Sequence, residues 1–112
     1  MELSFASKKL EKQLTEEREL KKCFTAFYKP LKRRMFELAT VESLLDISPE
    51  APQHRHLLKG KDAGCFGIDI TGNFRIVIQP VPPELPRLPD GNIDYQKIKH
   101  VKIVFVGDYH GD

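Results

Sequence analysis

The chain has 112 residues, 40% of them hydrophobic, which is enough apolar material for one core but not for two. We therefore predict a single domain over residues 1–112. The apolar runs, such as Ile103–Val106, are far shorter than the roughly 20 residues that span a bilayer. The charged N-terminus also lacks the apolar stretch of a secretory signal, so we expect no membrane association and a cytoplasmic location.

The formal net charge is only +2, but the charge is unevenly distributed. Residues 1–34 contain ten Lys and Arg against five Glu, whereas residues 35–112 contain eight basic residues against eleven acidic ones. A solvated helix surface explains most biases of this kind, and a surface that contacts phosphates is the alternative. The basic first third is compatible with both.

The first predicted elements are a short strand and a helix. Leu3 and Phe5 alternate with polar neighbours, as in a strand, and Ser7 is a residue type that caps helix N-termini. Residues 8 to about 22 are rich in Lys, Glu, Gln and Leu, which are good helix formers. We expect one helix over these residues, with its highly charged face exposed.

A second helix is predicted from about Pro30 to Leu45. Proline suits the first turn of a helix, where a backbone N–H has no partner within the helix. Apolar residues then recur at helical spacing and predict a buried stripe of Leu31, Met35, Leu38 and Leu45. Prolines between residues 48 and 53 predict a loop after it.

The second half of the chain alternates as strands do. Apolar residues occupy every second position over 66–70 and over 74–78, and Gly72-Asn73 between them supplies turn chemistry, which predicts a hairpin. Five prolines between residues 80 and 89, followed by Asp90-Gly91, predict an extended surface loop that cannot pair as a central strand. Alternation returns over residues 101–106 and predicts a last strand that stops at Gly107.

The order of these elements indicates the fold class. A strand and two helices precede three or four further strands, so helices and strands are segregated along the chain. This order favours an α+β fold with a mostly antiparallel, twisted sheet over a fold in which strands and helices alternate.

The sequence predicts neither a disulfide nor a metal site. Cys23 and Cys65 are far apart and form no C-x-x-C motif, so we interpret them as packing thiols. His54 and His56 flank Arg55, but no second ligand pair at zinc spacing follows them. No cofactor is predicted either.

Three short blocks stand out: His56-Leu57-Leu58-Lys59-Gly60, Gly72-Asn73-Phe74-Arg75 and Asp108-Tyr109-His110. Together, and in this order, they resemble HigB-type toxins of the RelE/ParE superfamily, whose pattern is His-x-Leu-Lys-Gly, Gly-Asn-Trp/Phe-Arg and a final Asp-Tyr-His. The resemblance spans nearly the whole chain. It departs from the family pattern in the longer segment from about Pro80 to His100 and in Gly107, where relatives often carry an acidic residue.

The resemblance implies a RelE-like microbial RNase fold and the activity of a type II toxin. Such a toxin cleaves messenger RNA in the ribosomal A site, inhibits translation, and is held inactive by a helix-turn-helix antitoxin similar to HigA. The expected partners are therefore the ribosome, messenger RNA and that antitoxin. The implied active-site residues are His56, Lys59, Arg75, Asp108, Tyr109 and His110.

These residue types suit the reaction. Attack by the 2′-hydroxyl needs a base for that hydroxyl, a proton donor for the leaving 5′-oxygen and positive charge on the phosphorane. His56 and His110 are suited to the proton transfers at neutral pH, and Lys59 and Arg75 can neutralise the developing charge. The sequence does not assign base and acid between the two histidines, and we favour His56 as base and His110 as acid.

The remaining two residues have supporting roles in this hypothesis. Tyr109 can stack on a base next to the scissile bond or orient the 2′-hydroxyl, and Asp108 can orient a histidine or a basic partner. His54 is interpreted as a bystander that assists binding. Two alternatives stay open: a ParE-like toxin that acts by binding a protein such as gyrase, which would not need the Asp-Tyr-His ending, and a small RNA-binding module.

Overall fold

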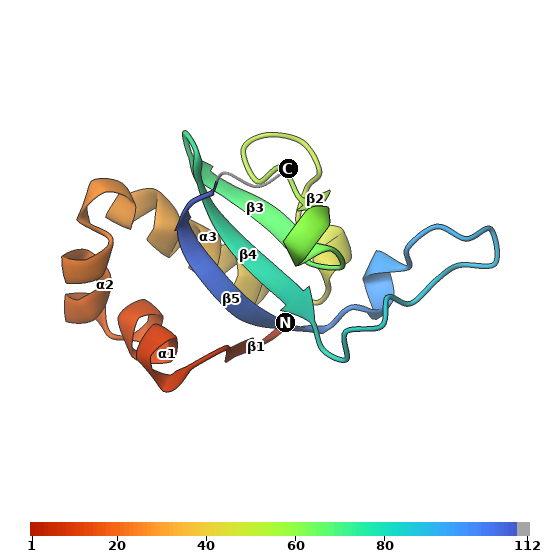
Figure 1. Ribbon diagram of the computed structural model, residues 1–112, viewed down its shortest axis with the longest axis horizontal. Coiled ribbons are helices and arrows are strands. Elements are labelled where there is room, and N and C mark those ends of the chain that lie inside the picture. The colour runs from red at the N-terminus through yellow and green to blue at the C-terminus, as the bar shows by residue number, and fades with distance from the viewer. Residues whose placement is uncertain (110–112) are drawn as a thin grey trace.

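A five-stranded sheet forms the centre of the structure, and the computed structural model describes residues 1–109 (Figure 1). The strand order is β1-β5-β4-β3-β2. The bounds are β1 (Glu2–Phe5), β2 (His56–Leu57), β3 (Phe66–Thr71), β4 (Phe74–Pro80) and β5 (His100–Asp108). All neighbouring pairs are antiparallel except β1 and β5, which are parallel. The predicted α+β class is confirmed, and the sheet is mixed because of β1.

The prediction of one continuous helix from residue 8 to about residue 22 is wrong, because this segment forms two helices. Helix α1 (Lys8–Thr15) ends at Glu16, whose backbone is extended (φ −97°, ψ 120°), and α2 (Glu17–Cys23) follows directly. In one straight helix, Leu14 and Leu20 would lie about 120° apart around the axis. The break at Glu16 allows both leucines to be buried in the same core. The cap is confirmed, since the Ser7 side chain accepts a hydrogen bond from the backbone N–H of Leu10.

The second predicted helix is α3 (Tyr28–Thr40), which ends earlier than expected. Pro30 lies in its first turn, and Leu31 and Leu38 are fully buried, as predicted. Leu45 is 51% exposed, so its predicted place in the core is wrong. The chain leaves the helix at Val41 and forms a 3₁₀ helix over Leu44–Asp46, which turns Leu44 into the core instead.

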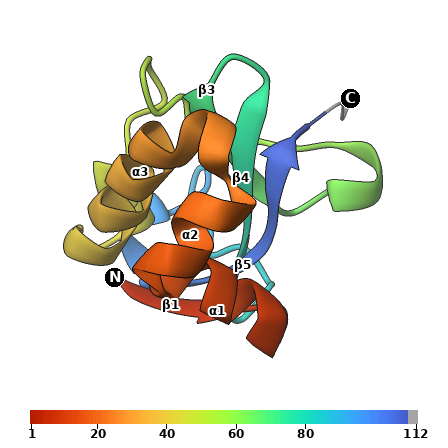
Figure 2. The same ribbon diagram turned by 90° about the vertical axis from the view of Figure 1, so that its left-hand side faces the viewer.

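The three helices lie on one side of the sheet, and the segment around residues 58–65 lies on the other (Figure 2). Alternate residues of β3, β4 and β5 face the helices and form the main core with Leu31, Leu38 and Leu44. These strand residues are Phe66, Ile68, Ile70, Ile76, Ile78, Val101 and Ile103. The residues between them therefore face away from the helices.

The predicted hairpin is confirmed: Thr71 pairs with Phe74 around Gly72-Asn73, and Gly72 has a left-handed φ of 54° that glycine adopts readily. The last strand extends to Asp108, one residue beyond the predicted end at Gly107. Pro80 contradicts the prediction, because it is the last residue of the central strand β4 and pairs with Val101. A missing N–H is tolerated there because the ladder ends at that residue.

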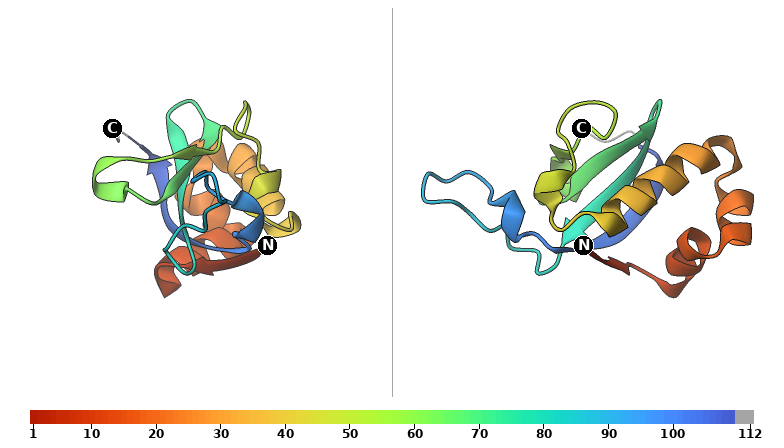
Figure 3. Two further views of the ribbon diagram at one scale, coloured as in Figure 1. Left: turned by 90° about the vertical axis from the view of Figure 1, so that its right-hand side faces the viewer. Right: turned by 180° about the vertical axis from the view of Figure 1, so that it is seen from behind.

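The proline-rich segment after Pro80 projects from the end of the sheet that is remote from α1 and α2 (Figures 1 and 3). It folds back through an isolated bridge between Arg87 and Ile93 and a 3₁₀ helix over Tyr95–Lys97. Ile98 is buried where the segment returns to the sheet. None of the helices in residues 1–109 has the length and apolar character needed to cross a bilayer.

Two leucine substitutions test the assignment of the core. Leu38→Ala should lower the free energy of unfolding by about 2–5 kcal/mol, because it empties space in a packed interior. Leu45→Ala, in a side chain that is half exposed, should change it by less than about 0.5 kcal/mol. Urea unfolding followed by circular dichroism measures both values. Equal effects of the two substitutions would contradict the burial assigned to these two leucines.

Candidate active site

The candidate site lies on the face of the sheet opposite the helices. In β3, Ile68 and Ile70 face the main core, so Asp69 between them faces the other way. Arg75 of β4 pairs with Asp69 across the two strands and therefore shares its face. The register of β3 against β4 shifts between Asp69 and Thr71. An irregularity of this kind re-aims side chains locally, and it is common next to functional sites.

Asp69 and Arg75 form an ion pair, with 3.1 Å between the carboxylate Oδ1 and the guanidinium Nε. Both atoms are shielded from solvent, yet the Nε–H does not have the direction of a hydrogen bond to Oδ1. The attraction is therefore mainly electrostatic. Since about a quarter of each side chain is exposed, it contributes at most about 1 kcal/mol to stability, and its main effect is to hold the two groups together.

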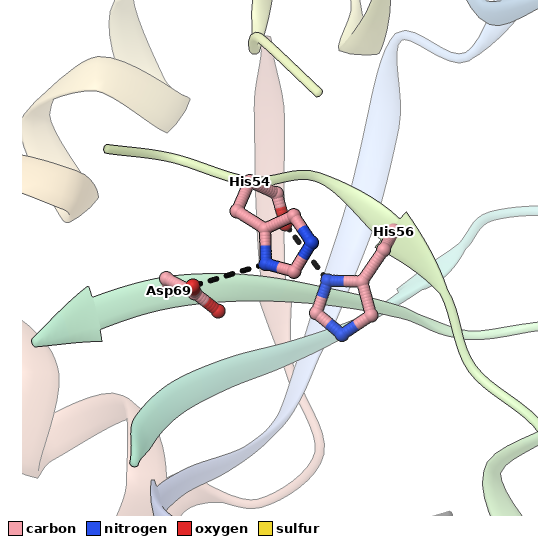
Figure 4. Close-up of side chains that lie close together, drawn as sticks. All are labelled: His54, His56 and Asp69. Atoms are coloured by element: carbon pink, nitrogen blue, oxygen red, sulfur yellow. Dashed lines mark hydrogen bonds and ion pairs between the residues drawn. The ribbon is translucent and has the colours of Figure 1, made fainter. Parts of the chain in front are cut away.

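His54 connects Asp69 to His56 (Figure 4). Its Nδ1 lies 3.0 Å from Oδ2 of Asp69, and its ring stacks on the His56 ring with 4.3 Å between centroids and 17° between planes. Nδ1 of His56 donates a hydrogen bond of 2.8 Å to the backbone carbonyl of His54. A neutral His56 therefore carries its proton on Nδ1, and its Nε2 is the basic nitrogen.

The backbone holds this histidine pair in place. His54 has a positive φ of 49°, which is uncommon for a residue other than glycine. Its N–H donates to the carbonyl of Glu50, and the N–H of Asp69 donates to the carbonyl of Gln53. The His56 ring lies directly over Gly67, the residue with which it pairs in β3.

Tyr109, just after β5, reaches the same face. Its ring centroid is 5.9 Å from the guanidinium carbon of Arg75, within the range of a cation–π contact. Its hydroxyl donates a hydrogen bond of 2.8 Å to Asp62, and its backbone N–H donates to the carbonyl of Asn73 in the hairpin turn. Tyr109 also packs against a small second core formed by Leu58, Cys65 and Val77.

The structure thus links three of the six predicted residues. Tyr109, Arg75, Asp69, His54 and His56 form one continuous chain of contacts on one face of the sheet.

The other predicted residues are placed as follows. Lys59 is exposed and directly precedes a 3₁₀ helix over Gly60–Asp62. Asp108 is exposed at the end of β5, opposite Phe74 and next to the pair formed by Arg75 and Gly107. His110 lies outside the described residues.

Sequence reasoning overlooked the residue at the centre of these contacts. Asp69 was not singled out, although an acidic residue between the buried Ile68 and Ile70 is a signal for a polar group on the opposite face of the sheet. Asp62 was also overlooked, and no motif marked it. His54 was interpreted as a bystander, whereas the structure places it between Asp69 and His56.

Cys65 is buried in the small second core with Leu58 and Val77, and it is not expected to act as a nucleophile. Burial raises the pKa of its thiol, and the nearby carboxylate of Asp62 adds to that effect. A raised pKa keeps the group protonated at neutral pH, and a protonated thiol is a poor nucleophile. Cys65 is buried and packs as predicted, whereas Cys23 is exposed, so the prediction that Cys23 is a packing thiol is wrong.

Comparison with family models, with curated proteins and with solved structures finds no match to this chain.

Gly67 offers a direct test of the position of His56. A Cβ atom at Gly67 would lie 2.8 Å from Cε1 and 3.0 Å from Nε2 of His56, so Gly67→Ala should displace the ring. We expect the His56 ring signals to shift in NMR spectra, with stability lowered by about 1–3 kcal/mol through overpacking. The ring of His100 is the internal control, because His100 lies in β5, which β4 and β3 separate from β2. Unchanged His56 signals would contradict the described placement.

Proposed function

We propose that this protein is a ribosome-dependent messenger-RNA endonuclease and the toxin of a type II toxin–antitoxin system of the HigB kind. The observation that carries the proposal is the chain of contacts from Tyr109 through Arg75, Asp69 and His54 to His56. It combines a basic nitrogen and a guanidinium, two of the three groups that RNA cleavage needs, with an aromatic ring on which a base can stack. The order of helices before a mixed sheet is compatible with the RelE-like fold that the resemblance implies.

The reaction is an internal transfer of the phosphodiester. Nε2 of His56 accepts the proton of the 2′-hydroxyl while that oxygen forms a bond to phosphorus. The bond from phosphorus to the 5′-oxygen breaks, and a general acid, assigned to His110 from the sequence, protonates the leaving oxygen. The products are a 2′,3′-cyclic phosphate and a 5′-hydroxyl. No water, metal ion or cofactor enters this step.

Arg75 is the group that neutralises the phosphorane in this proposal. Its Nε faces Asp69, and a guanidinium has four further N–H donors that can be directed at phosphate oxygens. Asp69 does not touch the reacting atoms here. It acts as a positioning residue, because its two carboxylate oxygens contact Arg75 and His54 separately.

Two aromatic side chains on this face can hold the flanking bases. Phe105 is 41% exposed and pairs with Val77, which faces away from the helices. The ring of Tyr109 lies 6.3 Å from that of Phe105. Unpaired bases stack on such rings without sequence preference, so these two side chains can hold bases of any identity.

Substitutions in the site should separate the roles of its residues. His56→Gln should lower the rate of cleavage by about 10²–10⁴-fold through loss of the base. Arg75→Gln should lower it by about 10²–10³-fold through loss of electrostatic stabilisation. Primer extension on a translated message measures the cleavage, with His110→Ala as the test of the proposed acid.

His100→Gln is the matched control, because this histidine contacts Ser4 at the other end of β5 and should leave cleavage unchanged. Full cleavage by either His56→Gln or Arg75→Gln would reject the assigned roles. Growth arrest that persists without any cleavage would instead indicate the ParE-like alternative, in which the toxin binds a protein target.

The low net charge of the protein predicts that cleavage depends on the ribosome. A net charge of +2 gives only weak attraction for free RNA, so positioning by the ribosome should be required. Purified RNA alone should be cleaved at least about 10³-fold more slowly than the same message on a translating ribosome, since positioning supplies several kcal/mol of the barrier reduction. Parallel time courses with and without ribosomes measure the ratio, and comparable rates would contradict ribosome dependence.

A further inference from the structure

We propose that His54, His56 and Asp69 also form a binding site for a divalent transition metal ion of the zinc class. One nitrogen from each ring and one carboxylate oxygen all lie within 4.8 Å of one another. The three side chains come from the loop before β2, from β2 itself and from β3 (Figure 4). The fold supplies the third ligand that the sequence alone did not connect with the two histidines.

The chemistry of the donor atoms favours zinc over the alkaline earth ions. Two imidazole nitrogens and one carboxylate oxygen are a common zinc ligand set, and three protein ligands leave the fourth tetrahedral position for water. Calcium and magnesium prefer oxygen ligands and are poorly served by two imidazoles. The proposal therefore concerns first-row transition metal ions such as Zn²⁺ and Co²⁺ and excludes Ca²⁺ and Mg²⁺.

The distances require only a local adjustment. Metal–ligand bonds of about 2.0–2.1 Å in a tetrahedron separate neighbouring donor atoms by about 3.3 Å. His54 Nδ1 and Asp69 Oδ2 are already 3.0 Å apart. The lone pairs of two stacked rings lie in nearly parallel planes, so one ring must turn out of the stack to close the widest separation, which is up to 4.8 Å. The His54 side chain is 46% exposed and has room to turn. The ion would replace the proton that His54 and Asp69 share.

The charge of Arg75 both supports and opposes metal binding. Arg75 contacts Oδ1 of Asp69, which orients the carboxylate and directs Oδ2 toward His54. Support of this kind strengthens a metal ligand. The guanidinium charge also repels a divalent cation, so the affinity should be below that of a structural zinc site with no nearby cation.

Metal occupancy would have a functional consequence, and this consequence rests on the proposed nuclease function. His56 cannot act as a base while it ligates a metal ion. Zinc would therefore inhibit cleavage, and a chelator would restore it. Binding itself does not depend on the nuclease proposal.

The test is a titration of metal-stripped, full-length protein with zinc chloride, followed by calorimetry. We expect one ion per chain. His54→Gln and Asp69→Asn should each weaken zinc binding by at least about 10–100-fold. Removal of a residue that only supports a ligand already has an effect of that size. His100→Gln should bind as the unchanged protein does. Asp69→Asn retains the backbone carbonyl that accepts from Arg34, and circular dichroism verifies that each variant is folded.

Cobalt absorption supplies an independent readout, because tetrahedral cobalt with nitrogen and oxygen ligands gives intense visible bands. Absence of one-to-one binding, or equal affinity in the wild-type protein and in both ligand variants, would overturn the site. Zinc binding without ribosome-dependent cleavage would reject the nuclease and keep the metal site. If the protein binds no zinc but cleaves messenger RNA on the ribosome, the metal site is rejected and the nuclease proposal is kept.

Discussion

The geometry of the candidate site depends on the contacts that hold Asp69 in β3. Its backbone carbonyl accepts a hydrogen bond of 2.9 Å from the buried Arg34 of α3, and its N–H donates to Gln53 in the loop before β2. Its side chain contacts His54 and Arg75. One residue thus connects the helical layer, a loop and two strands. Arg34 is buried, and a buried guanidinium without a partner is strongly unfavourable, so its hydrogen bond to the carbonyl of Asp69 keeps the backbone of that residue in place.

The two faces of the sheet have different tasks. The face toward the helices is apolar and buries the main core, which gives the sheet its rigidity. The other face is covered only in part, by the segment around residues 58–65 and by Tyr109. Polar groups on that face are backed by packed strands, so their positions are defined even where they meet solvent. Catalytic and binding groups benefit from this combination of rigid support and access.

Both proposed roles of the open face use the imidazole of His56. An imidazole that accepts a proton from a hydroxyl and an imidazole that ligates a metal ion each need a free lone pair. The stacked pair of His54 and His56 therefore permits proton transfer or metal binding, but not both at once. Competition of this kind would give a small protein a direct response to zinc.

The sequence by itself determined the local structure: the Ser7 cap, the hairpin around Gly72-Asn73 and the α+β class, because turn chemistry and apolar periodicity depend on near neighbours. It also pointed to His56, Arg75 and Tyr109 through short motifs. Only the tertiary structure decided the break at Glu16, the parallel pairing of β1 with β5 and the central position of Asp69. These features depend on contacts between residues distant in the chain. Asp69 meets His54 and Arg75 only because the strand register and the pleat direct all three side chains to the same face.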